Sequence, residues 1–196
     1  MRKWKRVDTA EGPRFRSTLD PHEAALLHNM VTSMVGMLDD REAAAPSDEL
    51  EQITGIRTGH ATPPEDATMS RILPDFFRPQ NNDHPAGSTA ADSLNSALRS
   101  LHEPEIIDAK REAARRLLDT CPKDGGRFEL NEGDANAWVA SVNDVRLALG
   151  SMLGMGPDGP DRLPPEHPMA GHLDVYQWLT VLQEYLVLGL MGKPIR

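Results

Sequence analysis

Helix-forming signals are clearest in residues 131–153, NEGDANAWVASVNDVRLALGSML. The Asn131 side chain can cap a helix, and Asp134 stands three residues later, where an acidic residue completes the cap. Apolar residues then follow at helical spacing: Trp138, Val139, Val142, Val145, Leu149, Met152 and Leu153. This continuous stripe predicts an amphipathic helix that buries one face in a core.

A second apolar segment, residues 174–191, follows a connection rich in proline and glycine over 154–171. Its apolar side chains lie nearly all round the expected helix. A helix with this pattern is either central in a bundle or shared with a second subunit.

Earlier in the chain the sequence predicts several further helices. The first has a sharp start, because Asp20 suits the N-cap, Pro21 the first helical position and Glu23 the capping box. Pro104 is expected to start a new helix for the same reason. Helices are predicted from 20, with a buried part that ends at 39–42, from 47 to before 55, within 64–73, over 90–101 and from 104 to about 120, with a flexible loop at 78–89.

The start of the chain has a strand pattern. Basic and apolar residues alternate over 1–19, which predicts a β-hairpin that turns within 8–13, and a strand over 127–130 could pair with it. The fold class is therefore mainly α, a helical bundle of about five to seven helices with a small antiparallel N-terminal hairpin. We expect a single domain over 1–196, built from the hairpin (1–19), a first helical segment (20–77), the loop (78–89) and the main bundle (90–191).

The composition is that of a globular protein: 39% of the 196 residues are hydrophobic, and the formal net charge is -9. This acidic total argues against non-specific nucleic-acid binding by the whole surface. The single cysteine excludes an internal disulfide and a cysteine-rich zinc site. No apolar run follows the first basic residues, and the most apolar stretch, 173–191, contains charged residues, so we expect a cytoplasmic protein without a membrane span.

Catalytic and metal-binding motifs are missing from the sequence. The seven histidines do not have the spacing of His-Glu-x-x-His, and there is no nucleophile elbow, phosphate-binding loop or dinucleotide fingerprint. We therefore expect no enzymatic activity, no catalytic residues, no bound metal and no cofactor.

Cys121 is the one candidate for redox chemistry. It stands at a predicted helix C-terminus, whose dipole disfavours a thiolate, whereas the nearby cations Arg115, Arg116 and Lys123 favour one. The balance stays open: Cys121 is either an inert small residue or a redox-responsive thiol that can pair only between chains.

A cluster of cations makes the N-terminal segment the best candidate for a binding surface. These side chains could contact phosphates or an acidic patch on a partner protein. Cations on an edge strand also protect proteins against aggregation, so both interpretations stay open. The cluster consists of Arg2, Lys3, Lys5, Arg6, Arg14 and Arg16.

Three motifs are distributed over the chain: basic residues around Trp4 and Phe15, Trp138-x4-Asn143-Asp144-x-Arg146-Leu147, and Tyr176-x-Trp178-Leu179-Thr180-x-Leu182-Gln183-Glu184. Together they resemble an actinobacterial family of formerly unknown function that includes an oxidative-stress transcriptional regulator. The resemblance covers essentially the full length. A polar network between the two longest helices could be formed by Asn143, Arg146, Gln183 and Glu184.

The resemblance implies a regulator that contacts a transcription protein such as a stress sigma factor, with thiol chemistry as its trigger. Cys121 alone cannot close an intramolecular bridge, so the trigger here is either an intermolecular disulfide or sulfenate, or it is not a cysteine. Two alternatives stay open. One is a regulator that binds DNA directly through the basic hairpin, and the other is a structural or adaptor homodimer whose last helix forms the contact.

Overall fold

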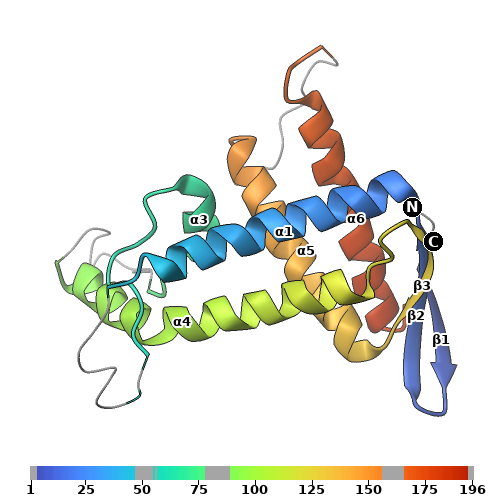
Figure 1. The fold of residues 1–196 in the computed structure, drawn as a ribbon, viewed down its shortest axis with the longest axis horizontal. Helices are drawn as coiled ribbons and strands as arrows, with labels where there is room; N and C mark the ends of the chain where they lie inside the picture. Colours follow the sequence, from blue (N-terminus) through green and yellow to red (C-terminus); the bar gives the residue numbers. More distant parts are fainter. Residues whose placement is uncertain (1–3, 47–54, 56, 78–88, 156–165, 194–196) are drawn as a thin grey trace. The chain divides into compact units, whose positions relative to one another are not determined.

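A computed structural model describes residues 4–46, 55, 57–77, 89–155 and 166–193 (Figure 1). The described residues form five helices and three strands, so the prediction of a mainly helical fold with a small antiparallel sheet is confirmed. The chain divides into two compact units, Met1–Val35 with Lys110–Arg196 and Gly36–Ala109. The boundaries fall inside two helices, α1 (Pro21–Ala43) and α4 (Thr89–Thr120). A single domain over 1–196 stays a prediction.

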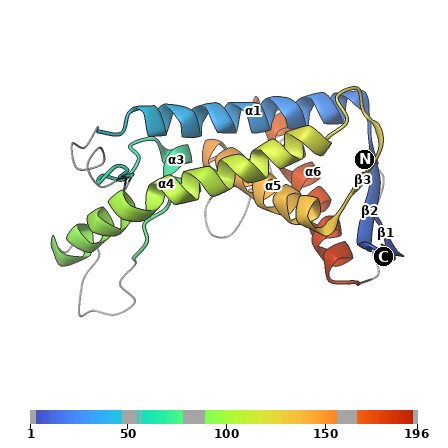
Figure 2. The same cartoon turned by 60° about the horizontal axis from the view of Figure 1, so that its bottom comes forward.

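The sheet of the first unit contains the predicted hairpin and the predicted third strand. Its strands are β1 (Lys5–Thr9), β2 (Gly12–Leu19) and β3 (Gly126–Leu130). They are antiparallel in the order β1-β2-β3, and Figures 1 and 2 show them side by side. The hairpin turn is shorter than predicted, because Gly12, with φ 108°, begins the second strand directly after Ala10 and Glu11.

One face of this sheet is buried. Phe15 lies opposite Leu130 in the strand register, and neither side chain is exposed. Three aromatic rings extend this core: Phe128 stacks on Trp138 with ring centroids 5.1 Å apart, and Trp4 meets the edges of both rings. Since aromatic pairs of this geometry stabilise a core beyond their buried area, the cluster fixes β3 against the following helix.

Helix α5 (Glu132–Met152) begins as its sequence predicts. The Asn131 side-chain oxygen accepts a hydrogen bond from the Asp134 N–H at 2.8 Å. In the predicted stripe Trp138, Val142, Val145 and Leu149 are buried and Val139 is half-buried. Met152 at the helix end is exposed, contrary to the expectation that it packs in the core. Helix α6 (Ala170–Leu190) packs against α5 and starts four residues before the predicted 174.

The start of α1 also follows the prediction. The Glu23 carboxylate accepts a hydrogen bond from the Asp20 N–H at 2.9 Å, which is one half of a capping box. Gly125, with φ 72°, lies so close that a Cβ there would be 2.7 Å from the Pro21 nitrogen. This close approach explains why a glycine turn precedes β3. The helix continues to Ala43, directly after residues 39–42, where the sequence predicts that its buried part ends.

The predicted restart at Pro104 is wrong, because α4 runs through this proline without a break. A proline inside a helix has no N–H for the carbonyl four residues earlier, which here belongs to Ser100. The Gly59 N–H supplies the missing hydrogen bond to the Ser100 oxygen at 2.8 Å. The loop around Gly59 therefore compensates the helix for its proline.

The short helix α3 (Ala67–Ile72) forms within the predicted 64–73, and the Asp66 side chain caps it at 2.8 Å from the Met69 nitrogen. Several predicted features lie outside the described residues. They are the helix from 47 to 54, the loop over 78–88, most of the 154–171 connection, and the cations Arg2 and Lys3. Among the helices that the structure describes, none has the length and apolar character needed to cross a membrane.

Candidate functional site

The outer face of the sheet gathers cations from all three strands. Lys5 lies opposite Arg16, which lies opposite Glu129, so these side chains form a row across the sheet. Alternation along the strands puts Arg14 and Arg127 on the same face. We call these five residues the outer sheet face. The sequence alone does not identify Arg127, since only the exact register of β3 brings it beside the hairpin.

Ion pairs neutralise part of this charge. Arg14 pairs with Glu11 at 2.7 Å, and Arg16 pairs with Glu129. Within the described part of the chain, Lys5 and Arg127 have no ion-pair partner, and both are exposed. The outer sheet face therefore carries two free cations, Lys5 on β1 and Arg127 on β3, and the ion pair between Arg16 and Glu129 lies between them.

Arg6 has a different surrounding from the other predicted cations. Its Nη1 donates to the carbonyl oxygens of Gly189 and Leu190 at 3.3 Å each, and its Nε pairs with Asp8 at 3.0 Å. Cations stabilise the last carbonyls of a helix. Arg6 therefore holds the C-terminus of α6, and its charge serves the fold of the first unit.

A polar network joins α5 to α6, as two of the four predicted residues suggested. Arg146 donates from Nε to Thr180 at 3.1 Å, from Nη1 to Gln183, and from Nη2 to the Tyr176 hydroxyl at 3.3 Å. Gln183 in turn donates to the Val139 carbonyl at 3.1 Å. Tyr176 and Thr180 were missed, although they share a helix face with Gln183 at i, i+4 and i+7 spacing.

Two predicted members do not join this network. Glu184 is exposed, and in the described part of the chain neither Asn143 nor Glu184 makes a side-chain hydrogen bond. Their neighbour Asp144 is instead buried and accepts a hydrogen bond from Lys110 at 2.7 Å. Burial raises the pKa of Asp144, and the attraction of the Lys110 ammonium opposes this rise.

Cys121 is buried at the end of α4, where only 4% of the residue is exposed. Burial raises the pKa of its thiol to about 12. The residue is therefore protonated at neutral pH, and a thiol of this kind reacts slowly with oxidants. The redox role of Cys121 stays a prediction, and it requires that the residue first becomes exposed.

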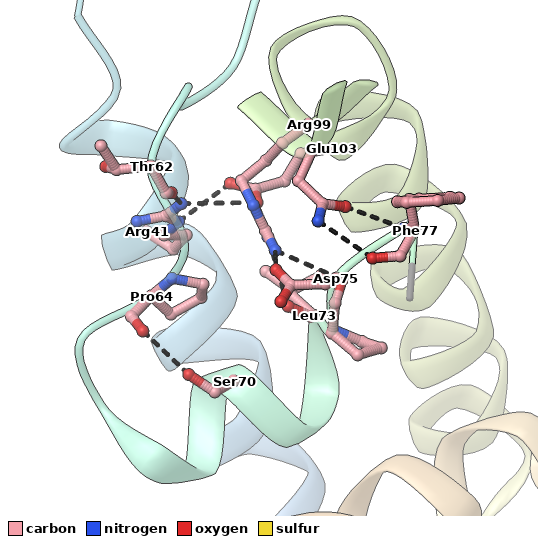
Figure 3. A network of polar contacts seen from close by, with 11 residues as sticks. Arg41, Thr62, Pro64, Ser70, Leu73, Asp75, Phe77, Arg99 and Glu103 are labelled. Carbon is pink, nitrogen blue, oxygen red and sulfur yellow. Dashed lines mark hydrogen bonds and ion pairs between the residues drawn. The ribbon is translucent and has the colours of Figure 1, made fainter. Parts of the chain in front are cut away.

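The second unit contains a buried ionic network (Figure 3). Arg99 and Glu103 are each 1% exposed and pair at 2.7 Å. Arg41 reaches the same carboxylate at 2.9 Å, and Asp75 pairs with Arg99 at 3.0 Å. The negative charges of two carboxylates thus balance the positive charges of two guanidinium groups. A buried ionic network needs this balance, because ion pairing has to offset the free-energy cost of removing each charge from water.

Main-chain carbonyls complete this network. Arg99 also donates to the oxygens of Leu73 and Pro74, and Arg41 donates to the oxygen of Thr62 at 2.6 Å. The network thereby connects the segments before and after α3 to α1 and α4 within the second unit. Since every carboxylate and guanidinium in it is paired, it fits a structural role better than acid–base chemistry.

A hollow of about 270 Å³ lies beside this network, and Arg57, His60 and Glu103 are among its lining residues. Arg57 is engaged by Glu42 at 3.3 Å and by Asp108. The His60 ring nitrogen lies 2.7 Å from the Arg41 carbonyl oxygen. Among the residues that the structure describes, no three side chains of the metal-binding types are close enough to hold an ion.

The fold and these sites define a mainly helical protein with a charged sheet face. The family model for the domain of unknown function DUF2017 matches residues 1–190, so the chain belongs to this family. The oxidative stress regulators AosR of Mycobacterium tuberculosis and Mycobacterium bovis are each 66% identical to it over 195 residues, covering 98% of this chain and 89% of theirs. The predicted family resemblance is thus confirmed. No solved structure matches the chain.

Proposed function

We propose that this protein is a non-enzymatic regulator of the oxidative-stress response that acts in the cytoplasm through contact with the transcription machinery. One observation carries the proposal: relatives with 66% identity over 98% of the chain bear the name oxidative stress regulator. The match covers 98% of this chain and therefore spans both units. A sigma factor is the partner we propose first, as the resemblance of the three sequence motifs implies.

The test of this function uses the full chain in its own host. Tagged protein is purified from cells with and without peroxide treatment, and co-purifying proteins are identified by mass spectrometry. We expect a sigma factor or another RNA polymerase subunit to co-purify, and we expect deletion of the protein to alter the transcripts induced by peroxide. Unchanged transcripts together with no transcription protein in the eluate would overturn the proposal.

A thiol trigger would act through Cys121, since the chain has one cysteine. Its burial means that oxidation would follow a local opening of the end of α4. The oxidised form would be a disulfide between two chains or a sulfenate. We expect peroxide to produce a covalent dimer that Cys121→Ser abolishes, and an unchanged transcriptional response in that variant would remove cysteine sensing from the proposal.

A structural or adaptor homodimer is the second candidate. It is favoured by the surface of α6, where Val181 is 39% exposed and lies in a stripe with the partly buried Trp178, Tyr185 and Leu188. Spacings of three and four residues are those of a helix–helix contact. Light scattering at micromolar concentration would detect the dimer, and a monomer would remove this candidate.

A further inference from the structure

We propose that the outer sheet face binds an extended acidic segment of a protein partner, and that Lys5 and Arg127 are the charges that hold it. This inference rests on the proposed function, because it assigns the contact surface and the partner's chemistry. It differs from a role for the basic hairpin alone, since Arg127 comes from β3 and Arg6 belongs to the fold.

The positions of the two free cations suit an extended chain. Neighbouring strands lie about 4.8 Å apart, and every second residue of a strand repeats at about 7 Å. Lys5 and Arg127 are therefore separated by two strand spacings across the sheet and one repeat along it, which is roughly 12 Å between their Cα atoms. Carboxylates at alternate positions of an extended segment recur at about 7 and 14 Å, within reach of the two long side chains.

The charge pattern favours a protein over a nucleic acid. Glu129 stands in the centre of the row with 39% of its side chain exposed, and Glu11 stands beside Arg14. A phosphate backbone carries a charge at every nucleotide and would have to place some of these charges beside Glu129 and Glu11. A protein segment can alternate acidic with neutral side chains and so match this mixed pattern.

Two uncharged residues beside the cations of the outer sheet face also favour an acidic protein segment as the partner. Val7 on β1 and Thr18 on β2 alternate with the cations and are partly exposed. Their β-branched side chains offer apolar contact between the charges. A partner whose acidic residues alternate with valine or threonine would bury these groups while it pairs with Lys5 and Arg127.

The test titrates the full-length protein with a twelve-residue peptide that alternates Glu with Val and Thr, and with its counterpart in which Gln replaces each Glu. Binding is followed by NMR, through the chemical shifts of the backbone amides of the protein. We expect the amide signals of the outer sheet face to shift with the Glu peptide and to stay unchanged with the Gln peptide. Lys5→Glu combined with Arg127→Glu should weaken binding at least about tenfold.

The control variant is Arg115→Glu, which reverses one charge on α4 instead of on the sheet, at a 64% exposed side chain. It should change the affinity by less than about twofold. Neither Lys5 nor Arg127 has an ion-pair partner among the described residues, so thermal unfolding should show that the double variant folds normally.

Three results of the titration would overturn the proposal: no binding of the Glu peptide at millimolar concentration, equal binding of the Gln peptide, or an equal loss in the α4 control. Tighter binding of duplex DNA that depends on Lys5 and Arg127 would assign the surface to nucleic acid. If transcription proteins still co-purify with the double variant, the regulator function stands and this surface is refuted. If they fail to co-purify with the unmodified protein, the proposed function itself fails.

Discussion

Gly59 donates its main-chain N–H to the carbonyl oxygen of Ser100 at 2.8 Å, which is the acceptor that Pro104 leaves without a partner inside α4. The two segments also touch sterically, since a Cβ on Gly59 would stand 2.9 Å from the Pro104 Cδ. Position 59 therefore needs both a free N–H and the absence of a side chain. The continuity of α4 in the second unit depends on this residue.

Gly59→Ala should destabilise the protein by about 1–3 kcal/mol, because the new methyl group forces the loop away from the Pro104 ring and lengthens the hydrogen bond to Ser100. Urea unfolding followed by circular dichroism would measure this. Gly36→Ala is the matched control, since a Cβ there meets nothing within 4 Å. That helical substitution should be neutral or stabilising by up to about 1 kcal/mol. Equal effects of the two would contradict the role of Gly59.

Glu103→Gln should reduce the free energy of unfolding by about 3–5 kcal/mol, because it removes the charge that Arg41 and Arg99 share and leaves Arg99 buried with one carboxylate partner. Denaturant titration of the full chain measures the loss. Glu105→Gln on the exposed side of the same helix should cost less than about 0.5 kcal/mol. A small effect at both positions would show that the network contributes little to stability.

Asp144 should give the protein a measurable pH dependence. Burial raises its pKa above the ordinary value of 3.8, so the folded state binds the proton more tightly than the unfolded state. Its contribution to stability is therefore fully present below pH 3.8 and is lost as the pH rises through the folded-state pKa. The free energy of unfolding of the unmodified protein, relative to Asp144→Asn, should increase from pH 7 towards pH 4. A difference that stays flat or changes in the opposite direction would contradict this.

The Cys121 thiol should react slowly in the folded protein. A pKa of about 12 instead of 9.0 lowers the thiolate fraction about a thousandfold at neutral pH. Labelling with iodoacetamide at pH 8, followed by mass spectrometry, should be slow in buffer and fast in urea. Equal rates in both would show that the thiol is accessible in the native state, and would remove the need for local opening before oxidation.

Local signals in the sequence predicted the elements with short-range causes. The cap at Asn131 and the half of the capping box that Glu23 makes depend on residues three positions apart, and both form as expected. Pro104 shows where local reasoning fails. Its proline suits a helix start, but the hydrogen bond that keeps the helix intact comes from Gly59, far away in the sequence.

For the cations of the sheet and for the Arg146 network, the sequence likewise predicted some of the members, but not those that the fold brings to them. The hairpin cations were visible as a cluster, whereas Arg127 joins them through the register of β3 with β2. Arg6 belongs to the same cluster in the sequence, yet strand alternation turns it towards the end of α6. For Arg146, the partner Gln183 was identified, but which other α6 side chains face it depends on how the two helices pack.

The division of the chain has a consequence for the order of synthesis. Gly36–Ala109 is one uninterrupted stretch, whereas the other unit is assembled from residues that precede and follow it in the chain. The ribosome therefore releases every residue of the continuous unit before β3 and α6 exist. The newly made hairpin therefore keeps the aromatic side of its strands uncovered until β3 and α5 have been synthesised. During that interval a chaperone would have its clearest substrate in β2.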